Sequence, residues 1–431
     1  MTSLTDPGAA GADLERVAAA LRFPPNWRDI CLDWTDAGRA VVPDVRPLLE
    51  PAYVARAGRD VGLTDDMIAT LSAFAARVAG DGNLLAFFRF CHLRMRNDPE
   101  FTNDWDDPWP RMDDALGPDC GLLNVLLMLS TVPHMRDTYR RLGIPADVAR
   151  DTVGDLKRWM ESDEPFQRHG KWGITPWIVR WLSRHWEGKI FHLKRLHFTP
   201  KDFNGRLRAY RRRGSGEVVA ISDAGVRYLA DGNAWGPCCG EPAGTWTSTL
   251  EETADSIVGH PIHPAGLARR ATMRLPKAEW DLVLAPGDTI LGIHIPTGSP
   301  MTFDDCGESF RRALEFYPRH FPEVRSKGFD TTSWLLDPRL ETLCGADSNI
   351  VRNLREFYLY PSANNSNISF FGRVFGWGVK GLAGLPRRTS LQKAVGGYVD
   401  GGGHFHGGSC FLLNEDLDWG SQVYRRMAER W

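Results

Sequence analysis

The sequence of 431 residues contains no apolar run of the roughly 20 residues that a membrane-spanning helix needs. The best candidate, Gly121 to Leu129, is far too short and is typical of a buried helix. Neither sign of charge dominates, because 52 Lys and Arg residues are balanced by 54 Asp and Glu residues. A nucleic-acid-binding protein usually carries an excess of basic residues. We therefore expect neither a membrane nor a nucleic acid as partner.

Closely spaced cysteines are also missing. The eight Cys residues are scattered without a Cys-x-x-Cys motif, so no disulfide framework is indicated. The first 15 residues show no basic segment followed by an apolar one, which is the pattern of a secretory signal. These features predict a cytoplasmic protein with reduced thiols. Aromatic residues, in contrast, are plentiful: 16 Trp and 21 Phe indicate large cores or an aromatic-lined cleft.

The pattern of apolar residues changes part-way along the chain. From Asp13 to about Trp186 the apolar spacing is helical. Near Lys189 the run KIFHLKRLHF alternates like a strand, and the strand-like runs RLRAY and GEVVAIS follow, joined by a hairpin turn. The sequence therefore predicts an α+β protein. Its helical N-terminal domain would span residues 1–186, and a mixed β-sheet domain flanked by helices would span residues 187–431.

Two segments of the second half have the pattern of a strand followed by a helix. The first consists of a strand at Thr289–Ile295, the loop PTGSP and a helix at Thr302–Tyr317. Thr302 can cap that helix. The second consists of a strand at Phe329–Leu336 followed by Asp337 and Pro338, a typical helix start.

The remaining signals concern breaks and the C-terminal part. Pro318 is predicted to end the first of these helices, since a proline does not continue a helix. The tail is predicted to contain a strand at Ile368–Phe375, a helix that starts near Ser390 and a glycine-rich hairpin, GGGHFHGGSCFLL, which ends near Leu413.

Three runs taken together resemble a known family. GDTILGIHIPTGSP, TTSWLLDPRL followed by SNI, and LPRRTSLQKAV resemble the GNAT-like C-terminal domain of a bacterial acyltransferase family. That family pairs this domain with a helical N-acyltransferase N-terminal domain, which IFHLKRLHF would close here. The resemblance covers about residues 40–413. It implies transfer of an acyl group from a thioester donor, acyl-CoA or an acyl carrier protein, to the amine of a small molecule by direct attack, with no metal.

The resemblance also implies where the thioester lies. In a GNAT fold the thioester arm pairs with the backbone of a central strand, and the next helix starts at the pyrophosphate. By position the strand is Gly287–Ile295 and the helix is Thr302–Tyr317, while the strand from Phe329 would splay away and open the cleft. Backbone N–H groups of 293–297 would polarise the thioester carbonyl. The residues assigned to donor binding are Ile293, Ile295, Thr297, Gly298, Ser299, Asn349 and Gln392.

The phosphate-binding part departs from the family pattern. The usual loop, Gln/Arg-x-x-Gly-x-Gly/Ala, is replaced by PTGSP. Asp304 and Asp305 in the first turn of the helix would repel a pyrophosphate. A carrier protein therefore stays open as the donor beside acyl-CoA. Asn349 and Gln392 have structural alternatives too, because each sits near a helix start.

His294 is the first candidate for the base that takes the proton of the amine. On a strand, Ile290, Gly292 and His294 share one face, and Gly292 leaves room for a ligand. An imidazole titrates near neutral pH and suits general-base catalysis. The alternative is a structural histidine that is hydrogen-bonded in the core.

Three further residues are candidates. If GGGHFHGGS is a strand end, His404 and His406 point the same way and can contact the substrate or act as a base. The alternatives are a solvated glycine-rich turn, or two metal ligands that lack an obvious third in the sequence. Ser333 could donate to the thiolate or to the acyl oxygen. Rival functions are a metal-dependent enzyme that uses His404, His406 and His294, and a non-catalytic ligand-binding module on the same fold.

Overall fold

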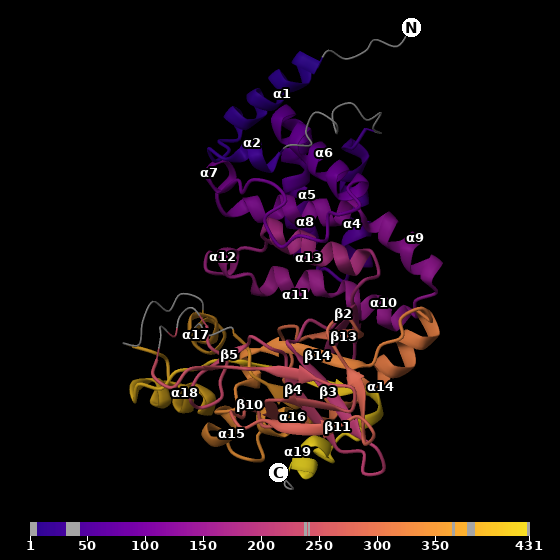
Figure 1. Ribbon diagram of the computed structural model, residues 1–431. Coiled ribbons are helices and arrows are strands. Elements are labelled where there is room, and N and C mark those ends of the chain that lie inside the picture. The colour runs from indigo at the N-terminus through magenta and orange to yellow at the C-terminus, as the bar shows by residue number, and fades with distance from the viewer. Residues whose placement is uncertain are drawn as a thin grey trace. The chain divides into compact units, whose positions relative to one another are not determined.

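The computed structural model describes residues 7–31, 44–236, 239, 242–363, 367–376 and 384–428. The chain forms two compact units (Figure 1). One comprises residues 1–193 with 296–298, and the other comprises residues 194–295 with 299–431. The first is built mainly of helices and the second mixes sheets with helices, so the predicted α+β class is confirmed. The domain limits at 186 and 187 stay a prediction.

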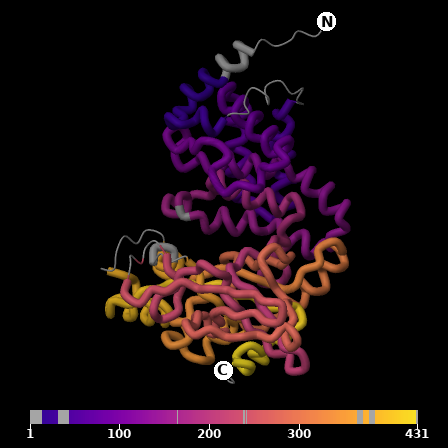
Figure 2. The backbone as a smooth tube through the Cα atoms, viewed as in Figure 1, coloured from indigo at the N-terminus to yellow at the C-terminus, as the bar shows by residue number. Residues whose placement is uncertain are grey.

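The first unit is a bundle of helices that follow one another along the chain from indigo to magenta in Figure 2. Thr64 caps α5 by accepting from the backbone N–H of Met67, and Asp81 caps α6 by accepting from Asn83 and Leu84. The helices are α1 (Pro7–Ala20), α2 (Trp27–Ile30), α4 (Pro51–Asp60), α5 (Asp65–Gly80), α6 (Gly82–Asn97), α7 (Asp113–Leu116), α8 (Cys120–Ser130), α9 (Val132–Leu142), α10 (Ala146–Val153), α11 (Asp155–Ser162), α12 (Glu164–Gln167) and α13 (Pro176–Trp186), with 3-10 turns η1 (Arg46–Leu49) and η2 (Gly117–Asp119) and strand β1 (Phe191–Leu193).

Helix α8 is the centre of this bundle. All of its residues are buried, and it packs against α4, α5, α6 and α13. A helix that is apolar on every side has to be covered on every side. In the described part of the chain no single helix is long and apolar enough to cross a membrane. Among the helix pairs of that part, residues 113–130 and 132–142, bent by 42° at their junction, reach that length and composition together.

The second unit contains a mixed sheet of strands in the order β2-β13-β14-β16-β15. The parallel pair β13 and β14 lies at its centre, and β16 runs antiparallel between β14 and β15. A second, antiparallel sheet has the order β10-β9-β4-β3-β12. The strands are β2 (Leu196–Asp202), β3 (Leu207–Arg212), β4 (Val218–Ser222), β5 (Arg227–Tyr228), β6 (Trp246–Thr247), β7 (Leu250–Glu252), β8 (Ser256–Gly259), β9 (Pro261–His263), β10 (Leu267–Ala268), β11 (Met273–Pro276), β12 (Trp280–Leu284), β13 (Thr289–His294), β14 (Gly328–Ser333), β15 (Tyr358–Tyr360) and β16 (Gly408–Leu413).

Helices complete this unit. They are α14 (Phe303–His320), α15 (Leu340–Leu343), α16 (Asn349–Arg355), α17 (Asn367–Phe375), α18 (Ser390–Asp400) and α19 (Val423–Ala428), with 3-10 turns η4 (Trp334–Leu336) and η5 (Asn414–Asp416).

The two faces of the mixed sheet are covered differently. On one face, Phe310 of α14 packs edge-on against Phe198 and Phe329. On the other face, the hydroxyl of Tyr358 accepts from the backbone N–H of Ala220 on β4, which ties the second sheet to this side. Because paired strand residues share a face, the register places polar residues together on the Tyr358 side: His197, Thr199, Lys201, His294, Asp330, Thr332, Ser409 and Tyr360.

Several predicted elements are confirmed. Thr302 caps α14 by accepting from the N–H of Asp305 at 3.2 Å. Ser348 caps α16 by accepting from the N–H of Val351. Thr389 caps α18 in a full capping box with Gln392.

Other predicted elements are wrong. Pro318 lies inside α14, which continues to His320; in the last turn only one backbone bond is lost to it. The predicted strand Ile368–Phe375 is helix α17, because Phe370 and Val374, four residues apart, are both buried. The strand predicted to reach Leu336 ends at Ser333 in a 3-10 turn. The glycine-rich segment is a loop that leads into the single strand β16 rather than a hairpin.

Candidate active site

The two central strands of the mixed sheet separate part-way along their length. β13 and β14 are in register only at Leu291–Phe329 and Gly292–Asp330. On its other side, β13 pairs with β2 along its whole length. Alternate N–H and C=O groups of β13 therefore point into the gap beyond Gly292, where an extended ligand can pair with them as an added strand. The predicted splaying of these strands is confirmed.

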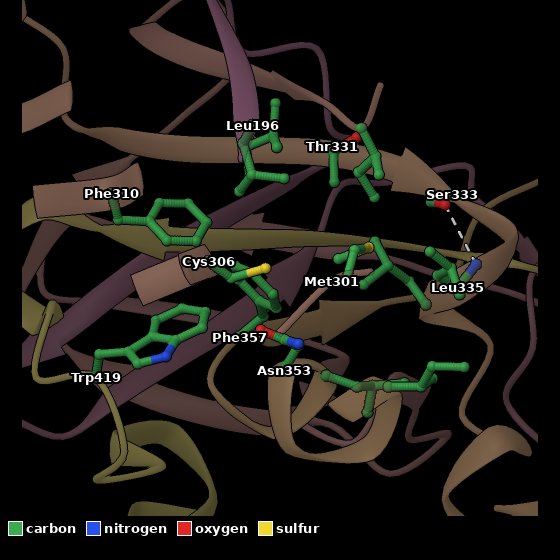
Figure 3. Close-up of a pocket in the computed structure, with 15 residues that line it drawn as sticks. Leu196, Met301, Cys306, Phe310, Thr331, Ser333, Leu335, Asn353, Phe357 and Trp419 are labelled. Carbon is green, nitrogen blue, oxygen red and sulfur yellow. Dashed lines mark hydrogen bonds between the residues drawn. The ribbon is translucent and has the colours of Figure 1, made fainter. Parts of the chain in front are cut away.

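A narrow apolar cavity of about 50 Å³ opens at this gap, on the side of α14 and α16 (Figure 3). Ile293 and Ile295, from β13 and its end, and Thr331 and Ser333 of β14 form the sheet side of the cavity. Two predicted donor-binding residues, Ile293 and Ile295, and one predicted catalytic residue, Ser333, thus lie together. The other lining residues are Leu196, Met301, Cys306, Phe310, Leu335, Leu336, Ile350, Asn353, Leu354, Phe357 and Trp419.

Asn353 of α16 brings an amide into this apolar cavity. In Figure 3 the amide lies between the rings of Phe310 and Trp419 at one end and Ser333 at the other. Asn353 is 5% exposed, and its Nδ2 donates to the carbonyl of Asn349 at 2.7 Å. Within the described residues no donor reaches its Oδ1. A buried carbonyl oxygen without a donor is costly, so this atom is suited to accept an N–H from a ligand.

Cys306 also lines the cavity, but its chemistry is unsuited to attack. Burial, with a smaller contribution from Asp305, raises the pKa of its thiol to about 11. Only the thiolate is nucleophilic, and at neutral pH almost none is present at such a pKa. The cavity is therefore a place for binding rather than for a covalent cysteine intermediate.

His294 lies on the opposite face of the sheet from the apolar cavity. Its partner across the strands is the buried His197, and the two ring centroids are 5.7 Å apart. Gly292, on the same face, leaves space that the side chain of Lys201 occupies, because a Cβ there would come within 3.0 Å of its Cε. His294 thus flanks the gap from the polar side. The sequence alone does not indicate His197, because only the strand register places it beside His294.

A buried carboxylate pairs with a partly exposed lysine where the two strands part. Asp330 is 2% exposed and stands opposite Gly292. Its Oδ1 is 2.8 Å from Nζ of Lys201. Burial raises the pKa of the Asp330 carboxyl, and Lys201 opposes that rise. The sequence alone does not indicate Asp330 either, because its partner Lys201 is distant along the chain.

The start of α14 carries cationic side chains beside the acidic residues that were predicted there. The Thr302 hydroxyl and then Lys194 lower the pKa of Asp305, and Nζ of Lys194 lies 3.1 Å from its carboxylate. Arg195 donates to the carbonyls of Ser299, at 2.7 Å, and Pro300. Two cationic side chains at this helix start offset the acidic residues that were expected to repel a phosphate.

His404 and His406 lie beside the start of β16. Their ring centroids are 4.9 Å apart. The buried carboxylate of Asp337 accepts from the backbone N–H of His406 at 2.7 Å and from that of Gly407. Burial, and then Arg339, lowers the pKa of His406 to about 4. A metal site needs at least a third ligand. Among the described residues, no imidazole, thiol or carboxylate has a ligand atom within 4.8 Å of those of both histidines.

The other predicted donor-binding residues lie outside the cavity lining. Gln392 is used within its own capping box, and its amide Nε2 donates to the carbonyl of Val374. Asn349 is exposed and is the first residue of α16. Thr297 and Gly298 group with the first unit, and Ser299 is bound through its carbonyl to Arg195.

Comparison with protein families identifies both parts of the chain. Residues 190–412 match the GNAT-like C-terminal domain, and residues 52–188 match the N-acyltransferase N-terminal domain. The chain belongs to this GNAT-like N-acyltransferase family. A search of curated proteins found no match.

Solved structures share the fold of this GNAT-like protein at 21% sequence identity. One is an acyltransferase in complex with decanoyl-CoA and teicoplanin, with a TM-score of 0.62 over 95% of this chain and 99% of that chain. A second is an acyltransferase in complex with CoA and 10C-teicoplanin, with a TM-score of 0.63 over 95% and 99%. A third is a mutant acyltransferase in complex with octanoyl-CoA, with a TM-score of 0.63 over 93% and 99%.

Proposed function

We propose that this protein transfers an acyl group from acyl-CoA to the amine of a small molecule. The observation that carries the proposal is the gap beyond Gly292–Asp330, with an apolar cavity at its side. A pantetheine arm can pair with the β13 edge there, as an added strand would. The lining of this cavity is almost entirely apolar, which suits contact with an uncharged part of the donor.

The donor is held by backbone and side-chain groups at this gap. Backbone N–H groups of residues 293–295 would polarise the thioester carbonyl. Oδ1 of Asn353 would accept from an amide N–H of the pantetheine arm, which supplies the missing partner. Lys194 and Arg195 offset the acidic residues at the start of α14, so this helix start no longer opposes an anionic donor such as CoA.

The reaction is a direct attack in a ternary complex. The neutral amine nitrogen attacks the thioester carbonyl carbon, the C–N bond forms and the C–S bond breaks. His294 takes the proton that leaves the nitrogen, and the CoA thiolate leaves and is protonated. Ser333, which lines the cavity, would donate to the thiolate, while its Oγ accepts from the N–H of Leu335 at 3.2 Å. The raised pKa of Cys306 argues against a covalent route.

The related acyltransferases support the choice of substrates. Their complexes hold octanoyl-CoA, decanoyl-CoA and teicoplanin. We infer a medium-chain acyl-CoA as donor and a small-molecule amine as acceptor. An acyl carrier protein remains the alternative donor, and His404 or His406 would orient the acceptor or replace His294 as base.

A screen for thiol release tests this proposal. The purified protein would be given acyl-CoAs of two to sixteen carbons, or an acyl carrier protein, each with a mixture of amines. We expect amine-dependent release of free CoA and an amide product in mass spectra, with a preference for chains of intermediate length. Thioester binding without any amide product would support a binding module instead, and loss of activity with a chelator would support the metal-dependent alternative.

A further inference from the structure

A second and larger cavity, of about 430 Å³, lies on the polar side of the mixed sheet. Thr332 of β14 lines this cavity, whereas its neighbours Thr331 and Ser333 line the apolar one. Since successive strand residues point to opposite faces, the two cavities lie on opposite sides of the same strand. The volume falls in the range of small-molecule sites, roughly 300–1,000 Å³.

The floor of this cavity is a row of three hydroxyl groups from three adjacent strands. Ser409 of β16 stands in register with Thr332 on one side and with Tyr360 on the other. Oγ1 of Thr332 is 2.7 Å from Oγ of Ser409, and the Tyr360 hydroxyl also interacts with Ser409. Hydroxyl groups both donate and accept, so this floor suits a polar ligand.

The walls supply positive charge and an aromatic surface. Arg206, which is exposed, and Arg227 both line the cavity. The guanidinium of Arg227 lies 4.1 Å from the ring centroid of Trp235, which is a cation–π contact. The described lining residues include two arginines and neither Asp nor Glu. Arginine forms charge-assisted hydrogen bonds with carboxylates, so the walls favour a carboxylate on the ligand.

The gap between β13 and β14 connects this side of the sheet to the thioester. The ladder between the two strands ends at Gly292 and Asp330, and Thr332 lies just beyond that point. His294 flanks the same gap on the polar face. Thr332, which lines the larger cavity, therefore lies at the edge of the gap beside which the thioester is proposed to lie.

We propose that the 430 Å³ cavity binds the acceptor, and that the acceptor carries a carboxylate besides its amine. The carboxylate pairs with Arg206 and Arg227, an aromatic or sugar-like body lies against Trp235, and the amine extends across Thr332 toward the gap. This proposal rests on the proposed acyl transfer and adds the substrate class.

Two amines of equal size and shape test the proposal: 4-(aminomethyl)benzoate and 4-(aminomethyl)benzamide, with decanoyl-CoA as donor. We expect the wild-type protein to prefer the benzoate by about tenfold or more in kcat/KM, mainly through KM, as a charge-assisted bond implies. Arg206→Gln, Arg227→Gln and the double variant should bring the ratio of the two values toward one. Arg212→Gln is the control, because Arg212 packs over Trp280 in the same unit but outside the cavity.

Binding of the products gives a readout that needs no turnover. Calorimetry should show that N-decanoyl-4-(aminomethyl)benzoate binds about tenfold more tightly than the corresponding benzamide, and that the double variant loses the difference. Equal binding of the two products by the wild type, or an unchanged preference in the double variant, would overturn the proposal. Because Arg206 is exposed, Arg206→Gln should leave the fold intact, and thermal unfolding of each variant would reveal a folding defect. If no amine is acylated but the benzoate product is preferred, the acyl transfer is wrong and the carboxylate-binding cavity stands.

Discussion

Replacing Asn353 by Leu should strengthen the fold and weaken the binding of acyl-CoA. In the free protein its Oδ1 is buried without a donor among the described residues, while its Nδ2 donates to the carbonyl of Asn349. A buried unpaired acceptor costs about 1–3 kcal/mol, and an amide hydrogen bond contributes about 0.5–1.5 kcal/mol. Leucine removes both, so the free energy of unfolding should change by between about −0.5 and +2.5 kcal/mol, and the middle of that range is a gain of about 1 kcal/mol.

The same substitution should weaken the binding of acyl-CoA. Without the Asn353 oxygen, a pantetheine N–H in the cavity stays buried and unpaired, at a cost of about 1–3 kcal/mol. The dissociation constant of decanoyl-CoA should rise about 5- to 150-fold. Calorimetric titration measures this change, and urea unfolding measures the stability. Asn353→Ala repeats the test without filling the cavity.

Asn124 provides the matched control. It is a buried asparagine in the first unit, and both ends of its amide are paired, with Trp109 donating to Oδ1 and Nδ2 donating to the carbonyl of Ile174. Asn124→Leu should therefore lower stability, by about 2 kcal/mol or more, and leave donor binding unchanged at temperatures where it is folded. Unaltered decanoyl-CoA affinity in both Asn353 variants would refute the assignment of this oxygen to the donor.

Three further predictions concern titratable groups. His294→Ala should lower kcat at least about 100-fold, as expected for a lost general base, with unchanged unfolding; wild-type turnover would remove His294 from the mechanism, and His169→Ala is the control. Lys201→Met should cost about 2 kcal/mol at pH 7 because it leaves Asp330 buried and unpaired. Since the folded-state pKa of Asp330 is raised, that loss should shrink as pH falls through it, and Asp330→Asn should remove the loss; a pH-independent loss contradicts this. Because the folded-state pKa of His406 is about 4, unfolding takes up a proton on this imidazole between pH 6.5 and 4, and the fold loses stability there. His406→Gln should remove this loss: from pH 7 to pH 5, the free energy of unfolding measured in urea should fall about 2 kcal/mol less in the variant than in the wild type. Identical pH profiles of the two proteins would contradict the buried imidazole.

Helices were predictable where a capping residue precedes apolar residues at the helical spacing. Thr302 followed by an apolar stripe indicates α14, and Thr389 with Gln392 indicates α18. The prediction failed where two periods compete. The aromatic residues of 368–375 fit a strand by composition, but the burial of Phe370 and Val374 follows the helical period.

The candidate site was predictable along single strands and not between them. His294, Ile293 and Ile295 were assigned from one strand and its resemblance to a family, and the two isoleucines line the cavity. Asp330 and His197 depend on partners that only the sheet register brings together. Asn353 has no sequence signal of its own. It lies one helical turn after the predicted Asn349 on the same short helix.

The position of the thioester is the central claim, and a crystal structure of the protein with a non-reactive thioether analogue of decanoyl-CoA would test it most directly. We predict that the pantetheine arm lies between β13 and β14, paired with the backbone of 293–295, with an amide N–H donating to Oδ1 of Asn353. An arm bound elsewhere, with this gap closed by direct pairing of the two strands, would contradict the account.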